Sequence, residues 1–154
     1  MFNIVLVHPQ IPNNTGNIGR LCVGTNAVLH LIEPIGFSLD HTMLLRAGLD
    51  YWPHLQLNTY SSWQHFRHQH PDNNLVFFSA AGKKSFYDCP FQKNDFLIFG
   101  RESDGLPTQL KQQFTQQTYH IPIINPVVRS YNLGNSVAMV LGEGIRKIMG
   151  DGVF

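Results

Sequence analysis

Three short segments combine glycine and arginine with small polar residues, a composition that builds polar turns and holds anions. They cover residues 13–20 (NNTGNIGR), 99–107 (FGRESDGLP) and 121–136, whose end reads RSYNLGNS. Each lies beside a β-type run, and the carboxyl edge of an open α/β sheet is where such folds bind ligands. Helix caps and tight turns use the same residues. That simpler interpretation fits each segment alone, but the three together predict one polar site.

Common catalytic signatures are absent from the sequence. The first β-type run leads into HPQIPNNTGNIGR at 8–20 rather than a GxGxxG turn, and no Walker A, HExxH or GxSxG motif occurs. Cys22 and Cys89 stand alone, which is typical of packing residues in a reducing compartment. His65, His68 and His70 have metal-like spacing but no carboxylate or cysteine beside them, so we expect a solvated helix end and no metal.

Composition and charge predict one soluble domain. The chain has 154 residues, 43% of them hydrophobic, and a net charge of +1. This is enough for one core, so we expect a single domain over 1–154. We also expect a cytoplasmic protein, since the sequence shows neither a basic, apolar leader nor a run long enough to span a membrane. The charge excludes a strongly basic nucleic-acid binder, so any RNA contact must come from local patches.

The hydrophobic pattern predicts an α/β fold with a mainly parallel sheet flanked by helices. Most of the β-type runs are continuous apolar stretches, as in strands covered on both faces. They lie at 2–8, 28–33, 55–60, 75–80, 95–100 and 118–123. Helices are expected to start near Thr15, Thr42, Ser62, Pro107 and Asn135. Residues 81–94 are expected to form an exposed loop with room for a short edge strand.

The last predicted helix, about 135–149, is unusually rich in small residues. Gly134, Gly142 and Gly144 accompany Ser136 and Ala138. An interior glycine destabilises a helix by about 1 kcal/mol relative to alanine. We therefore expect another chain, or the protein's own backbone, to pack closely against this helix.

Taken together, these blocks resemble the SPOUT superfamily of RNA methyltransferases, and within it the short tRNA 2′-O-ribose methyltransferases of the TrmL type. The similarity spans the chain, with matching blocks at 2–22, 30–40, 44–52, 99–107 and 129–147. It implies a SPOUT-type fold with a C-terminal trefoil knot, and a homodimer. It also implies methyl transfer from S-adenosylmethionine, without a metal, to a ribose 2′-hydroxyl of tRNA, leaving S-adenosylhomocysteine.

The resemblance to this subfamily implies that the target is the wobble nucleotide, position 34 of the anticodon loop. A cytidine or modified uridine there is unpaired, so its ribose is reachable without melting a helix. Two alternatives stay open: another tRNA or rRNA position, and a non-catalytic RNA-binding module. The sequence departs from the family pattern at Gly134, where serine is common, at Gly142, where tyrosine is common, and in a slightly long loop at 121–130. The change at Gly142 leaves the dimer geometry open.

Carried over by position, the resemblance places the methyl donor against six residues. They are Phe78, Ser79, Gly100, Ile121, Ser130 and Leu133. An apolar slot with a few backbone and hydroxyl partners suits an adenosine. For Phe78 and Ile121 the alternative is plain sheet core.

The resemblance gives catalytic roles to Arg20, Glu102, Arg129 and Asn135. A guanidinium is a poor base, so Arg20 is interpreted first as a clamp on the target phosphate and ribose. Arg129 is interpreted as a second phosphate ligand. Glu102 is expected to hold Arg20 or Arg129 in a bidentate pair, with ordinary surface pairing as the alternative.

Neutral hydrogen bonds near the target hydroxyl are expected from Asn17, Ser130 and Asn135. Capping of the last helix by Asn132 or Asn135 is the simpler interpretation of these side chains. Both interpretations can hold at once.

The predicted RNA contacts follow exposed polar and basic residues. They are Asn17, Arg20, Arg46, Lys83, Lys84 and Arg129. Each phosphate contact adds salt-dependent attraction. The alternatives are a solvated loop for the two lysines and a salt bridge to Asp50 for Arg46. Tyr131 and Trp52 can stack on unpaired bases, although packing is the better interpretation of Trp52.

Overall fold

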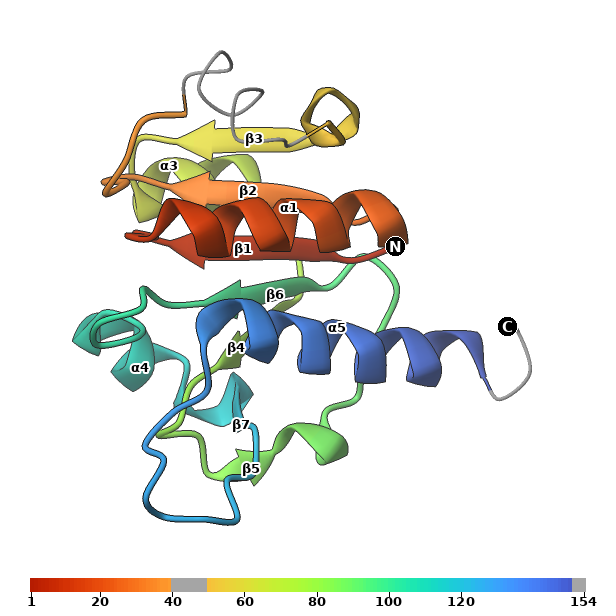
Figure 1. Ribbon diagram of the computed structural model, residues 1–154. Helices are drawn as coiled ribbons and strands as arrows, with labels where there is room; N and C mark the ends of the chain where they lie inside the picture. The colour runs from red at the N-terminus through yellow and green to blue at the C-terminus, as the bar shows by residue number, and fades with distance from the viewer. Residues whose placement is uncertain (40–49, 151–154) are drawn as a thin grey trace.

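A seven-stranded sheet runs through the part of the chain that the computed structural model describes, residues 1–39 and 50–150 (Figure 1). Its strands are β1 (Asn3–Val7), β2 (Val28–Ile32), β3 (Leu57–Tyr60), β4 (Leu75–Phe78), β5 (Lys84–Ser85), β6 (Phe96–Phe99) and β7 (Thr118–His120). They lie in the order β3-β2-β1-β6-β4-β7-β5, and every pairing is parallel. The predicted α/β fold with a mainly parallel sheet is confirmed, while the trefoil knot stays a prediction.

Helices cover both faces of this sheet. They are α1 (Pro12–Thr25), α3 (Trp63–Gln69), α4 (Thr108–Gln113) and α5 (Leu133–Met149), with short 3-10 helices at Trp52–His54, Phe86–Asp88 and Thr115–Gln117. In Figure 1, α1 and α5 lie side by side on one face of the sheet, where both contribute to one apolar core. Side chains of α3 and α4 enter a second core on the opposite face. The continuous apolar runs of β1, β4 and β6 are therefore buried on both sides.

The helix ends differ from the sequence-based expectations by a few residues. α1 begins at Pro12 rather than Thr15, and α5 at Leu133 rather than Asn135. α3 follows Ser62, whose hydroxyl accepts a hydrogen bond from the His65 N–H at 3.0 Å, as expected of an N-cap. The helix expected near Thr42 lies outside the described residues. The short edge strand expected in 81–94 is β5.

The glycines of α5 divide into two kinds. A Cβ on Gly144 would lie 3.0 Å from the Phe2 ring and 3.2 Å from Phe91, so the chain's own core requires glycine there. A Cβ on Gly142 would meet nothing within 4 Å. Close packing is thus found at Gly144, but against two aromatic side chains rather than the expected backbone or second chain, and the described residues give no reason for Gly142. Among them, no helix combines the length and apolar character needed to cross a membrane.

Candidate active site

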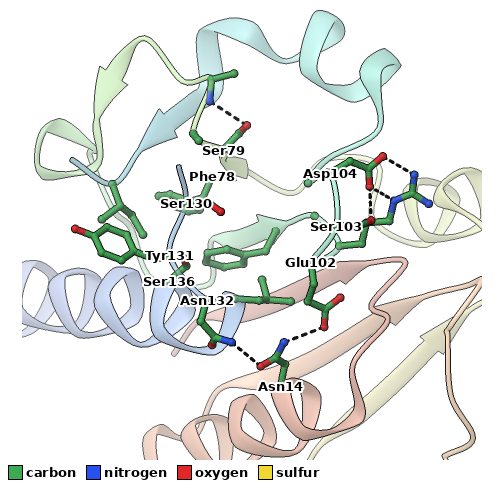
Figure 2. A pocket seen from close by; sticks show the side chains of 18 of the residues that line it. Asn14, Phe78, Ser79, Glu102, Ser103, Asp104, Ser130, Tyr131, Asn132 and Ser136 are labelled. Carbon is green, nitrogen blue, oxygen red and sulfur yellow. Dashed lines mark hydrogen bonds and ion pairs between the residues drawn. The ribbon is translucent and has the colours of Figure 1, made fainter. Parts of the chain in front are cut away.

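A cavity of about 600 Å³ opens at the carboxyl edge of the sheet, where β4, β6 and β7 end (Figure 2). Its walls come from five parts of the chain: the start of α1, the end of β4 with the residues after it, the turn after β6, Lys111 of α4, and the segment from β7 into α5. The three polar, glycine-containing segments of the sequence therefore meet at one place. This is the edge at which open α/β sheets bind their ligands.

All six residues predicted to contact the methyl donor line this cavity: Phe78, Ser79, Gly100, Ile121, Ser130 and Leu133. Phe78 is only 6% exposed and its ring stacks on Phe99 with centroids 5.1 Å apart. Ile121 and Leu133 pack against the same core cluster. Phe78 and Ile121 therefore pack against the core, as the simpler interpretation expects, and at the same time form part of the cavity wall.

The turn after β6 is shaped by two glycines. A Cβ on Gly100 would lie 2.0 Å from the carbonyl carbon of Gly105, so no other residue fits there. Gly105 has a φ of +73°, in the left-handed region that favours glycine. An antiparallel bridge between Arg101 and Gly105 closes the turn. This tight turn presents residues 101–104 to the cavity.

Glu102 supplies the cap that α1 lacks. Ile11, at the N-cap position, has no capping side chain, and Pro12 has no N–H. The Glu102 carboxylate accepts hydrogen bonds from the Gln10 N–H at 2.8 Å and from the Ile11 N–H at 3.0 Å. A negative charge at a helix N-terminus is favourable. The expected pair with Arg20 or Arg129 is not formed, because both carboxylate oxygens face these amide donors.

A chain of side-chain hydrogen bonds continues from Glu102 across the cavity floor (Figure 2). The Asn14 amide donates to Glu102 Oε1 at 3.2 Å, and the Asn132 amide donates to Asn14 Oδ1 at 2.9 Å. Asn132 Oδ1 then accepts from the Asn135 N–H at 3.2 Å and so caps α5. We call Glu102, Asn14 and Asn132 the relay. It links the turn after β6, α1 and α5 in one network, and it confirms Asn132, not Asn135, as the cap of the last helix.

Four other predicted residues lie outside the cavity wall. Arg20 and Asn17 are exposed on α1, and Arg129 and Asn135 are exposed before and within the start of α5. The Arg20 guanidinium lies 4.8 Å from the Tyr51 ring centroid and 4.0 Å from the Asp50 carboxylate. Glu102 is therefore the one residue of the predicted catalytic set that lines the cavity.

The predicted basic RNA contacts are spread over the surface. Lys83 and Lys84 are exposed, and Lys84 donates to the Gln116 carbonyl at 3.0 Å. Arg46 lies outside the described residues. Trp52 is 7% exposed and packs against α1, with its ring 3.1 Å from the position of a Cβ on Gly19, so the packing interpretation is confirmed. Tyr131 lines the cavity and donates to the Pro122 carbonyl at 3.2 Å.

Sequence reasoning missed several cavity residues that lie inside the segments it singled out. Asn14 is 7% exposed and lies on the first turn of α1. Arg101 and Asp104 form a forked ion pair at the cavity wall, and this pair holds the pKa of Asp104 at about 2. Lys111 of α4 also lines the cavity. The signal available for Asn14 was its position beside Asn13 and Asn17, which alone does not say which asparagine faces inward.

His65 of α3 and His70, which follows this helix, form side-chain hydrogen bonds. His65 bonds to Ser61 and Gln69, and His70 to the Tyr60 hydroxyl at 2.9 Å. Over residues 1–39 and 50–150, no group of three or more histidine, cysteine, aspartate or glutamate side chains is arranged to hold a metal ion.

Comparison with known proteins places this geometry in a family. Residues 1–142 match the model of the SpoU rRNA Methylase family. A tRNA (cytidine(34)-2′-O)-methyltransferase of Burkholderia cenocepacia is 45% identical over 150 residues, covering 96% of both chains. A solved structure described as giving structural insights into the 2-OH methylation of C/U34 on tRNA is 40% identical, with a TM-score of 0.89 over 96% of this chain and 95% of that one.

A more distant structure shares the fold alone. The SpoU methyltransferase AviRb of Streptomyces viridochromogenes, solved in complex with the cofactor AdoMet, is 20% identical with a TM-score of 0.78. It covers 94% of this chain, which spans 57% of that one. The resemblance to SPOUT-type enzymes is thereby confirmed, and the chain belongs to the SpoU methylase family of RNA methyltransferases.

Proposed function

We propose that this protein transfers a methyl group from S-adenosylmethionine to the ribose 2′-hydroxyl of nucleotide 34, a cytidine or modified uridine, in the anticodon loop of tRNA. The observation that carries the proposal is the cavity at the sheet edge, whose wall contains all six residues expected to hold the donor. The 45% identical relative, which carries this activity in its name, supports the choice of substrate. We place the reaction in the cytoplasm, as a reaction on tRNA.

The residues around the cavity fit this donor. A volume of about 600 Å³ lies within the range of roughly 300 to 1,000 Å³ that is usual for pockets of small ligands. Phe78, Ile121 and Leu133 give apolar surface for an adenine, and the Ser79 and Ser130 hydroxyls line the same wall. The turn at Gly100 brings backbone amides and carbonyls to the cavity without an intervening side chain.

When bound, S-adenosylmethionine supplies a methyl group already activated on a sulfonium, so the protein must mainly orient the acceptor and exclude water. The relay fixes the start of α1 and the start of α5 against the same cavity. Glu102 acts in this proposal as a positioning residue, because its oxygens already accept three hydrogen bonds.

Arg20, Arg129 and Asn17 are proposed to hold the RNA. All three are exposed, and arginine binds phosphate in a bidentate fork. Among the described residues, Arg20 contacts the exposed Asp50 carboxylate at 4.0 Å and the Tyr51 ring, and an exposed ion pair of this kind is weak. A phosphate can therefore replace them at little cost.

We further propose that the enzyme is a homodimer whose second copy completes the site. Arg20 and Asn17 on α1, and Asn135 on α5, are exposed and do not line the cavity of their own chain. Both helices lie on one face of the sheet, where Met139 is 40% exposed and Gly142 has open space around it. A twofold contact across this face would bring α1 of each copy toward its partner.

The proposed activity is tested by incubating the purified protein with bulk tRNA and donor labelled on the methyl group, followed by nucleoside mapping. The expected product carries one 2′-O-methyl group at position 34. If the label were found at another tRNA or rRNA position, the proposed reaction would stand but the proposed substrate would be wrong. Absence of both transfer and calorimetric binding of the donor would overturn the proposal in favour of an RNA-binding module.

The dimer is tested by subunit complementation. Arg20→Ala removes the arginine, and Leu133→Trp blocks the cavity. If Arg20 serves the partner's cavity, co-expressed mixtures of the two inactive variants regain about a quarter of the wild-type sites, since random pairing makes half of the dimers mixed and each mixed dimer has one intact site. If Arg20 serves its own cavity, no mixture regains activity, and the shared site is refuted.

A further inference from the structure

One cation of the cavity wall has no part in the reaction as proposed above. Arg101 follows β6, and only Arg101 and Lys111 bring positive charge to the described wall. The Arg101 guanidinium donates through Nε to Asp104 Oδ1 and through Nη2 to Asp104 Oδ2, the latter at 2.6 Å. The Ser103 hydroxyl also donates to Asp104 Oδ1, at 2.8 Å. The positive charge of Arg101 is thus already paired with the neighbouring Asp104 carboxylate.

The backbone that carries this pair is anchored on several sides. Arg101 and Gly105 exchange two backbone hydrogen bonds, at 3.0 and 3.2 Å. The Ser103 N–H donates to the Gln10 side chain at 3.2 Å, and Lys111 Nζ donates to the Asp104 carbonyl at 3.1 Å. The turn is therefore held in place while the two charged side chains remain open to solvent, with 40% of the Arg101 and 59% of the Asp104 side chain exposed.

Such a pair can exchange its anion. An ion pair whose members are both hydrated contributes little to stability, because water competes for each charge. A phosphate offers the same two-oxygen acceptor geometry as the Asp104 carboxylate and carries its charge to the same fork. The target ribose must reach the cavity for methyl transfer, and a phosphate is bonded to each side of that ribose. An RNA in position therefore brings phosphates to the cavity mouth.

We propose that Arg101 binds a phosphate next to the target nucleotide and that Asp104 holds the guanidinium in place until the RNA displaces it. This inference rests on the proposed function and adds an RNA ligand to the same site. Asp104 is then a competitor for the arginine: it lowers RNA affinity and keeps the fork ordered in the free enzyme. Removing Arg101 is therefore expected to lower the affinity for RNA, and removing Asp104 is expected to raise it.

The test measures tRNA affinity against salt concentration for four proteins, each saturated with S-adenosylhomocysteine. They are the wild type, Arg101→Gln, Asp104→Asn and the double variant. Arg101→Gln is expected to weaken binding and to flatten the slope of log affinity against log salt by about 0.7 to 0.9, the value for one phosphate. Asp104→Asn is expected to tighten binding several-fold. In the double variant that gain disappears, because no freed arginine is present.

Controls of the same charge change come from the opposite edge of the sheet. Lys93→Gln and Asp72→Asn alter exposed residues that precede β6 and β4, and both are expected to leave the slope unchanged. If Asp104→Asn raised the tRNA affinity equally with and without Arg101, the cause would be the loss of a negative charge alone. That result would overturn the inference. So would a loss of donor affinity in Arg101→Gln, which would assign the arginine to the donor's carboxylate.

The inference and the proposed function fail in different ways. A wild-type protein that binds no tRNA overturns both. A wild-type protein that methylates tRNA, with a salt slope that Arg101→Gln does not change, overturns only the role of Arg101.

Discussion

Replacing Glu102 by glutamine tests whether the relay positions the site or takes part in the chemistry. In the structure, Oε2 accepts the Gln10 N–H, and Oε1 accepts both the Ile11 N–H and the Asn14 amide. In Glu102→Gln one of these oxygens is replaced by an amide NH2 group, which donates hydrogen bonds and cannot accept them. The least damaging orientation turns that group toward Gln10, which leaves one backbone donor unpaired and removes the negative charge from the start of α1.

The expected cost follows from these contacts. Leaving one donor unsatisfied and weakening charge-assisted hydrogen bonds costs about 1 to 3 kcal/mol. For a chain of this size that lowers the melting temperature by roughly 2 to 12 °C. If the same energy is lost from the alignment of donor and acceptor, the rate falls by about 5- to 160-fold, at 1.36 kcal/mol for each factor of ten. Loss of a general base instead costs about 100- to 10,000-fold.

Thermal unfolding and single-turnover methyl transfer measure the two effects together. Glu143→Gln is the matched control, because the Glu143 carboxylate pairs with Arg146 inside α5 and lies outside the cavity wall. We expect the control to change the rate little. A rate loss above 1,000-fold in Glu102→Gln with an unchanged melting temperature would refute the positioning role and make the carboxylate a proton acceptor.

Two further predictions concern stability. Gly142→Ala is expected to stabilise the protein by about 0.5 to 1 kcal/mol in urea unfolding. Gly144→Ala is expected to destabilise it, because the added Cβ would lie 3.0 Å from the Phe2 ring. Effects of the same sign would contradict the packing described for α5. Burial, and secondarily the charge of His70, lowers the pKa of His30 from 6.5 to about 4, so the folded state is favoured fully above pH 6.5 and loses roughly 3 kcal/mol as the pH falls toward 4. His30→Gln, which does not titrate, should flatten this decline in unfolding measurements between pH 7 and pH 4.5, and an unchanged slope would remove His30 as its cause.

The strands could be predicted from the sequence because buried strands consist of continuous apolar runs. LVFF at β4 and FLIF at β6 are buried at every position. Such runs need no knowledge of neighbouring elements. The donor residues, by contrast, came from the family resemblance alone: nothing in the residue pattern separates Phe78, which faces the cavity, from Phe77, which belongs to the opposite core.

Helix starts and site partners were harder to predict because their partners are distant in the chain. The cap of α1 comes from Glu102, 92 residues after Gln10, and Asn14 meets Asn132 over a separation of 118 residues. Local capping rules look within three or four residues of the helix end, so they placed the start of α1 too late. The arginine partner expected for Glu102 followed from charge complementarity and was wrong. The exposure of Arg20 and Asn135 likewise depends on how α1 and α5 pack. This packing could not be predicted from the sequence.

The relay connects helix capping to the shape of the cavity. α1 has no cap of its own, and the carboxylate that replaces it belongs to the turn lining the cavity. α5 is capped by Asn132, whose amide binds Asn14 of α1. Each capping contact is therefore also a contact that shapes the cavity. Since the same hydrogen bonds do both, a substitution in the relay must change stability and transfer rate together, whereas the exposed Arg20 can lose activity with no loss of stability.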